Sequence, residues 1–184
     1  HAINLGIGGD RTEHVLWRLE NGHLHGLTPE VAVVMIGTNN FGHDTPDTPA
    51  EVLEGIVAVV EKLKSSLPDV HVLLLDIFPR GRSFNQMRGS ILQVNQALKT
   101  AYAKDDRVTF FPIGDLFIED DGSIHQAIMP DYLHLSEKGY QIWFDATREK
   151  LPRLKNTLSK GQFLMMGSCP NCSTHLVPTV GSRA

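Results

Sequence analysis

Short, nearly continuous apolar runs recur along this chain and predict buried strands. The longer runs are rich in valine, isoleucine and leucine, as are strands that helices cover on both faces of a parallel sheet. Four such runs are present: Ala2–Leu5, Val31–Ile36, Val70–Ile77 and Val108–Phe111.

Between these runs the apolar residues recur every three or four positions, which predicts helices. Thr48 and Glu51 form a capping-box sequence ahead of one of them. Asp10 is placed to cap the first helix and Ser136 to cap the last. The four predicted helices span residues 11–21, 49–67, 86–103 and 136–151.

This alternation of strand and helix predicts an α/β fold in which helices cover both faces of a parallel sheet. Ligands bind such sheets in the crevice beyond the carboxyl ends of the strands. Gly9, Asn39 and Ser83 each follow a predicted strand. We therefore expect all three at the same edge of the sheet.

Composition predicts one globular domain, which we place over residues 1–159. The 184 residues are 41% hydrophobic, enough for a single core. The formal net charge of −4, without any basic run, argues against a nucleic-acid partner. No apolar stretch approaches the roughly 20 residues that span a bilayer, so no membrane span is expected. The compartment stays open.

Residues 160–184 break the periodicity with glycine and proline, and we expect an irregular tail there. This tail holds both cysteines of the chain, Cys169 and Cys172, too few for a disulfide framework. With His175 they have the spacing of half a zinc site. A structural zinc site needs four ligands, so a solvated tail is the favoured interpretation.

Asp131 and His134 form the most informative motif. An acid three residues ahead of a histidine on one turn can hold the imidazole in a single orientation and tautomer, as a general base in acyl transfer requires. The alternative is that His134 is a polar loop residue, held by Asp131 ahead of the last helix. The other histidines show no such spacing, although His43 follows Asn40 closely enough to lie near a pocket.

Two glycine-containing loops offer donors to a developing negative charge. They supply the backbone N–H of Gly9, ahead of a helix, and the side-chain amide of Asn39, which follows a strand through Gly37. Taken singly, an ordinary turn explains Gly9 better, and an Asx turn explains Asn39 better. Their joint occurrence with Asp131 and His134 favours ester cleavage.

Three blocks in this order resemble the SGNH (GDSL) hydrolase superfamily: Gly8-Gly9-Asp10, Gly37-Thr38-Asn39-Asn40 and Asp131-Tyr132-Leu133-His134. The stretch from Asn4 to Gly22 more narrowly resembles the catalytic subunits of platelet-activating-factor acetylhydrolase Ib, and the similarity covers about residues 1–157.

The resemblance implies a flavodoxin-like three-layer α/β/α fold and a serine ester hydrolase that removes a short acyl group such as acetyl. It implies no metal, no cofactor, a small ester substrate and a homodimer. Carried over by motif, His134 is the general base and Asp131 orients it, while Gly9 and Asn39 are the oxyanion donors.

The resemblance also implies a nucleophilic serine in a Gly-Asp-Ser block after the first strand. This chain has no such block and begins at about the second strand. The family's sheet places the missing strand between the strands at 2–5 and 31–36. We therefore expect an empty slot there, a marginally stable fold and a chain without appreciable activity.

Two serines are candidate substitutes. Ser168 follows the apolar run Gln162–Met166, and a parallel strand there would fill the slot and bring Ser168 to the active edge, as in a circular permutation. Ser83 lies in the loop after the third strand. We favour truncation, because the family's aspartate is missing beside Ser168 and the chain has no Gly-x-Ser-x-Gly motif.

Two other classes of function stay open. Metallophosphoesterases carry blocks similar to Gly-Gly-Asp and Gly-Thr-Asn-Asn, although the further histidines that hold their two metals do not follow the right strands here. A non-catalytic fragment or pseudoenzyme is the other alternative. Metal content and an esterase assay separate the three.

Overall fold

The structure, a computed structural model, describes residues 2–148 and 162–167. Its strands form one parallel sheet: β1 (Ala2–Asn4), β2 (Pro29–Met35), β3 (His71–Leu75), β4 (Val108–Phe111) and β5 (Gln162–Gly167). Their order across the sheet is β1-β5-β2-β3-β4, and all neighbours run parallel.

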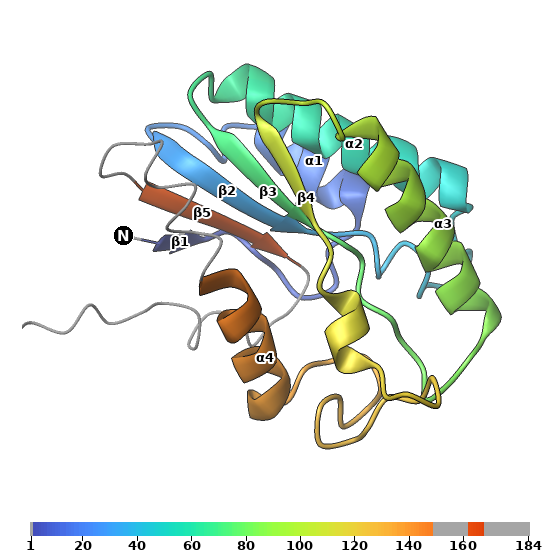
Figure 1. Ribbon diagram of the computed structural model, residues 1–184. Helices are drawn as coiled ribbons and strands as arrows, with labels where there is room; N and C mark the ends of the chain where they lie inside the picture. The colour runs from blue at the N-terminus through green and yellow to red at the C-terminus, as the bar shows by residue number, and fades with distance from the viewer. Residues whose placement is uncertain (1, 149–161, 168–184) are drawn as a thin grey trace, which may run out of the picture.

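Helices cover both faces of this sheet (Figure 1). On one face lie α1 (Thr12–Glu20), α2 (Pro49–Ser66) and α3 (Gln86–Ala101). On the other lie α4 (Glu137–Arg148) and the short 3-10 helix η1 (Gly114–Phe117). The predicted three-layer α/β fold is confirmed.

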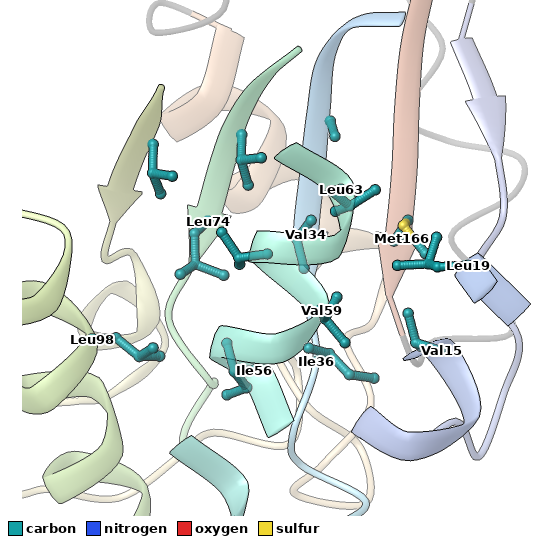
Figure 2. Close-up of a cluster of buried hydrophobic side chains, with 14 of the residues drawn as sticks. Val15, Leu19, Val34, Ile36, Ile56, Val59, Leu63, Leu74, Leu98 and Met166 are labelled. Carbon is teal, nitrogen blue, oxygen red and sulfur yellow. The ribbon is translucent and has the colours of Figure 1, made fainter. Parts of the chain in front are cut away.

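Side chains of β2 alternate between the two faces of the sheet, as the period of a strand requires. Ala32 and Val34 belong to the cluster under α1, α2 and α3, which Figure 2 shows. Val31 and Val33 belong to the cluster under α4. All four are buried. The sheet is thus packed from both sides, and the loops at the strand ends start from fixed positions.

Two of the three predicted helix caps are present. Thr48 accepts the N–H of Glu51, and the Glu51 carboxylate accepts the N–H of Thr48 in return. Ser136 caps α4 by accepting the N–H of Gly139 at 3.2 Å. The prediction that Asp10 caps α1 is wrong.

The residue at the N-cap of α1 is Arg11, and the Asp10 carboxylate pairs instead with Arg18 near the other end of the helix. Because the Asp10 carboxylate is paired with Arg18, it does not cap the helix. The side-chain oxygen of Asn40 accepts the free N–H of Thr12 instead, at 3.1 Å. The cap of α1 therefore comes from the loop after β2, and it ties the two loops together.

The slot between β1 and β2 is filled by β5. In register, Leu164 lies opposite Ile3 on one side and Ala32 on the other. The side chains of Leu164 and Met166 are buried in the cluster under α1, α2 and α3, and Met166 points toward α1 in Figure 2. The prediction of an empty slot is therefore wrong. β1 and β2 both present N–H and C=O groups toward this slot, and the apolar run at 162–167 pairs with both.

The same strand corrects the expectation of an irregular tail from residue 160, because residues 162–167 belong to the sheet. The domain boundary near residue 159 lies outside the described residues and stays a prediction. None of the helices in residues 2–148 is both long enough and apolar enough to cross a bilayer.

Candidate active site

A cleft lies at the carboxyl ends of the central strands, where the loops after β2 and β3 meet the segment before α4. It brings together Asn39 and His134, which are far apart in the sequence. The residues that line it are Met35, Ile36, Thr38, Asn39, Ile77, Phe78, Leu133, His134, Leu135, Tyr140 and Trp143.

The turn from Asp131 to His134 wraps around the acid. The Asp131 carboxylate accepts a hydrogen bond from Nδ1 of His134 at 2.6 Å. It also accepts the backbone N–H groups of Leu133 and His134, at 3.1 and 2.8 Å. Tyr132, between Asp131 and Leu133, has a φ of 59°, a conformation that strains a bulky side chain and persists only when its surroundings hold it.

These bonds set the charge of the pair. The hydrogen bond from the His134 side chain, followed by the backbone N–H of His134, lowers the pKa of Asp131 to about 2. The carboxylate is therefore ionised at neutral pH and favours the tautomer with the proton on Nδ1, which leaves Nε2 to take a proton. The side chains of His134 and Asp131 are 49% and 55% exposed, so solvent reaches the pair.

Asn39 lies where β2 enters its loop, with its side-chain amide held in place. Nδ2 donates to the backbone carbonyl of Asp10 at 2.9 Å, which leaves a second N–H for a ligand in the cleft. Gly37 makes this turn possible, with a φ of 116°, and a Cβ there would lie 2.9 Å from Cδ1 of Ile77. Only glycine lets the chain turn this close to the core.

Gly9 lies on the surface, in the loop after β1. Its φ is 83°, and open space surrounds the position a Cβ would take. Within residues 2–148 and 162–167 its N–H makes no backbone hydrogen bond. Gly9 does not line the cleft, but the bond from Asn39 to Asp10 places the two candidate donors on adjoining loops.

A buried ion pair lies beneath this junction. The Arg18 guanidinium contacts the Asp10 carboxylate, and their side chains are only 12% and 8% exposed. Nε and Nη1 of Arg18 are buried and have no hydrogen-bond partner in the described part of the chain. Buried charges are costly unless paired. The pair therefore fixes Asp10, whose carbonyl orients Asn39.

Aromatic rings form the apolar wall of the cleft. Phe78 and Trp143 meet edge to face at 5.3 Å and 86°, and Tyr140 stacks on Trp143 at 6.0 Å. Rings in these arrangements attract each other beyond simple burial. The wall is therefore preformed, and it suits an apolar group next to the polar end of the cleft.

Other sequence-predicted candidates do not join this group. Ser83 is exposed in the loop after β3, and neither it nor His43 lines the cleft. Asn40 is buried and serves the loop junction, with its Nδ2 donating to Thr12 at 3.0 Å. Among the residues that the structure describes, no three His, Cys, Asp or Glu side chains are placed to hold a metal ion. The candidates outside the described residues are Ser168, Cys169, Cys172 and His175.

A buried acid close to the cleft is not among the residues predicted from the sequence. Asp76 directly follows β3, and its carboxylate accepts the N–H groups of Ile113 and Gly114 at 2.9 and 3.0 Å. Burial raises the pKa of Asp76 to about 6, although these two N–H groups favour its charged form. The position of Asp76 within the apolar run at 70–77 is the feature of the sequence that indicates a buried acid.

Two arginines that hold the loops were also missed. Arg80 donates to the backbone carbonyl of Thr38 at 2.9 Å. Arg88 is only 6% exposed within α3. Its spacing of three residues before the buried Ile91 was a signal that Arg88 faces inward.

The sequence matches the family model described as the GDSL-like Lipase/Acylhydrolase family over residues 1–142. It is 44% identical over 154 residues to platelet-activating factor acetylhydrolase IB subunit alpha1 from Homo sapiens, covering 84% of this chain and 65% of that protein. Subunit alpha2 from Rattus norvegicus is 43% identical over 140 residues, covering 76% of this chain and 59% of that protein. The chain thus spans less than two thirds of the length of these relatives.

The fold is similar to that of a GDSL-like lipase from Bacteroides thetaiotaomicron, with a TM-score of 0.62 and 20% sequence identity. That similarity covers 80% of this chain and 74% of the other.

Proposed function

Because the chain belongs to the GDSL-like lipase/acylhydrolase family, a family of carboxylic ester hydrolases, we propose that its cleft is the active site of a serine ester hydrolase. One observation carries this proposal: His134, whose side chain is hydrogen-bonded to Asp131, lines the same cleft as Asn39. That cleft lies beyond the carboxyl ends of the strands, where open parallel sheets bind their ligands.

In this mechanism Nε2 of His134 takes the proton from a serine hydroxyl as the oxygen attacks the ester carbonyl, and returns it to the leaving alcohol. The ionised Asp131 stabilises the imidazolium that forms in between. The Asn39 amide and the Gly9 N–H donate to the carbonyl oxygen as it becomes negative. Gly9 lies just ahead of α1, whose dipole favours that charge. Water then releases the acyl group by the same route.

We propose a short acyl group, such as acetyl, as the group removed. The relatives are named acetylhydrolases, and the cleft places apolar Leu133 and Phe78 beside polar Thr38 and Asn39. A series of p-nitrophenyl esters of increasing acyl length tests this. We expect kcat/KM to be highest for acetate, and a preference for octanoate would contradict the proposal.

The nucleophile is the part of the site that the described residues do not supply, because no serine lines the cleft there. We therefore propose that this chain by itself has no appreciable esterase activity, and that the parent enzyme uses a serine of a Gly-Asp-Ser block. Ser168 is the alternative nucleophile. It directly follows Gly167, the last residue of β5, which lies opposite Met35 in the sheet.

The test is hydrolysis of p-nitrophenyl acetate by this 184-residue chain and by the protein extended upstream with such a block. We expect activity in the extended protein alone, lost in its His134→Ala variant with the fold retained. Hydrolysis by the short chain that Ser168→Ala abolishes and Ser83→Ala does not would instead identify Ser168 as the nucleophile. An extended protein that folds and binds the ester without cleaving it would favour a non-catalytic role.

We also propose that the protein forms a homodimer, because both relatives are named as subunits. Light scattering after size exclusion tests this, and a monomer mass at micromolar concentration would contradict it.

A further inference from the structure

Arg88 carries a buried positive charge that no acidic side chain of the described residues neutralises. Its guanidinium donates instead to three backbone carbonyls: Nε to Arg80 at 3.1 Å, Nη2 to Gly81 at 2.6 Å and Nη1 to Gly122 at 2.5 Å. Burying a cation this way is costly, and charge-assisted hydrogen bonds offset the cost only when their geometry is kept.

The Arg80–Gly81 segment that Arg88 holds touches both halves of the candidate site. On one side the Arg80 guanidinium donates to the carbonyl of Thr38, directly before Asn39. On the other side the N–H of Gly81 donates at 2.8 Å to the carbonyl of Tyr132, between Asp131 and His134. Two residues thus link the loop of the oxyanion donor to the turn of the general base.

The third carbonyl that Arg88 binds, that of Gly122, belongs to a segment that also reaches Tyr132. Gly122 lies in a segment whose Ile124 N–H donates to the Arg82 carbonyl at 2.9 Å. Further along that segment, the carbonyl of Met129 accepts the N–H of Tyr132 at 3.0 Å. Both backbone groups of Tyr132 are therefore hydrogen-bonded. Its carbonyl is bonded to Gly81, which contacts Arg88, and its N–H is bonded to Met129, in the segment that follows Gly122.

We propose that Arg88 is a positioning residue, which clamps the Arg80–Gly81 segment and so sets His134 in register with Asn39. The strained φ of Tyr132 needs its surroundings to hold it, and the bond from Gly81 is one of those restraints. Without the clamp the turn relaxes, and Asp131 and His134 lose their mutual geometry. A displacement of about 1 Å can lower a rate about a hundredfold.

The guanidinium suits this role better than an ammonium does. Its planar fork reaches acceptors in three fixed directions, whereas the compact ammonium of lysine is a point charge on a flexible stem. Arg88→Lys keeps the charge but loses the geometry, which separates positioning from simple charge burial.

Arg107 provides a matched control. It also donates to backbone carbonyls, those of Lys64, Leu67 and Val70, but at the amino ends of β3 and β4, away from the cleft. Arg107→Met therefore removes a comparable clamp without touching the segment that holds His134.

The experiment compares Arg88→Met, Arg88→Lys and Arg107→Met with the unmodified chain, by circular dichroism and by NMR. The ¹⁵N shifts of the His134 ring report which nitrogen carries the proton, and amide exchange reports the bond from Gly81 to Tyr132. In Arg88→Met we expect a mixture of His134 tautomers and Gly81 exchange that is faster by about tenfold, as when one hydrogen bond is lost. Arg88→Lys should be intermediate, and Arg107→Met should change neither signal.

Unchanged His134 shifts and Gly81 exchange in folded Arg88 variants would overturn the proposal. Equal changes in Arg107→Met would also overturn it, since the effect would then be general destabilisation. If Arg88→Met does not fold, Arg88→Lys decides by the same signals. The catalytic meaning of the clamp rests on the proposed function, but neither readout needs turnover. An inactive extended protein with a responsive His134 would therefore refute the esterase and leave the clamp standing.

Discussion

Leu164→Ala tests whether β5 is an integral strand of the sheet. Leu164 is fully buried between β1 and β2, in the cluster under α1, α2 and α3. The substitution removes three carbon atoms from this site. At about 0.8 kcal/mol for each buried methylene, with a further term for the cavity, we expect a loss of roughly 3–4 kcal/mol in the free energy of unfolding.

That loss is a large fraction of the roughly 5–15 kcal/mol that stabilises a domain. Urea denaturation followed by circular dichroism measures it. With a slope of about 2 kcal/mol per molar urea, the midpoint should fall by roughly 1.5–2 M without a change in slope.

Leu92→Ala is the control, because it makes the same chemical change on α3 at a side chain that is 62% exposed. We expect it to stay within about 0.5 kcal/mol of the unmodified chain. If Leu164→Ala is as mild as Leu92→Ala, then β5 does not occupy the slot in solution.

In the upstream-extended protein, Asn39→Ala should lower kcat by about 10²–10³ with little change in KM, as loss of an oxyanion donor does; unchanged ester turnover would remove Asn39 from that role. Burial raises the pKa of Asp76 to about 6 from an ordinary 3.8, so the folded protein holds the Asp76 proton more tightly than the unfolded chain does. The stability that this proton contributes is present below about pH 4 and is lost as pH rises through 6. Relative to Asp76→Asn, the free energy of unfolding of the unmodified chain should therefore fall by roughly 2.5 kcal/mol between about pH 4 and pH 7, and parallel pH profiles would contradict this. Arg18→Met should cost roughly 3 kcal/mol in denaturation experiments, because it leaves the buried Asp10 carboxylate unpaired. Arg148→Met, at an exposed ion pair of 3.7 Å, should cost under about 1 kcal/mol; equal losses would mean that the Asp10 pair is no more than a surface contact.

The features that sequence analysis predicted are the local ones. The capping box of Thr48 and Glu51 begins α2 as expected, since its partners lie within one turn of each other. The pairing of Asp131 with His134 is equally local, and the structure brings their side chains within 2.6 Å. The catalytic roles of these residues stay predictions.

The features that sequence analysis missed depend on partners more than one helical turn away in the chain. Asp10 has the spacing of a helix cap, but its carboxylate pairs with the buried Arg18 instead of the N–H groups at the start of α1. The spacing of Arg88 indicates an inward face, while its acceptors, which include the Gly122 carbonyl, become visible only in three dimensions. Local propensity does not resolve such competitions.

The wrong prediction about the slot shows how differently folding and catalysis constrain one position. To complete the sheet, a strand between β1 and β2 needs paired backbone groups and an apolar face toward α1 and α2. Leu164 and Met166 meet that need in β5. Cores accept many apolar sequences of suitable volume and pattern.

Catalysis instead requires one particular residue beyond the end of that strand, placed within hydrogen-bond reach of Nε2 of His134. Filling the slot removes the main physical reason to expect a marginal fold, because the ladder groups of β1 and β2 are paired. Residues 162–167 contain no serine, so the described part of β5 does not itself hold a nucleophile. Stability and esterase activity are therefore separate measurements in this chain, and the combination that we propose is a well-folded protein without turnover.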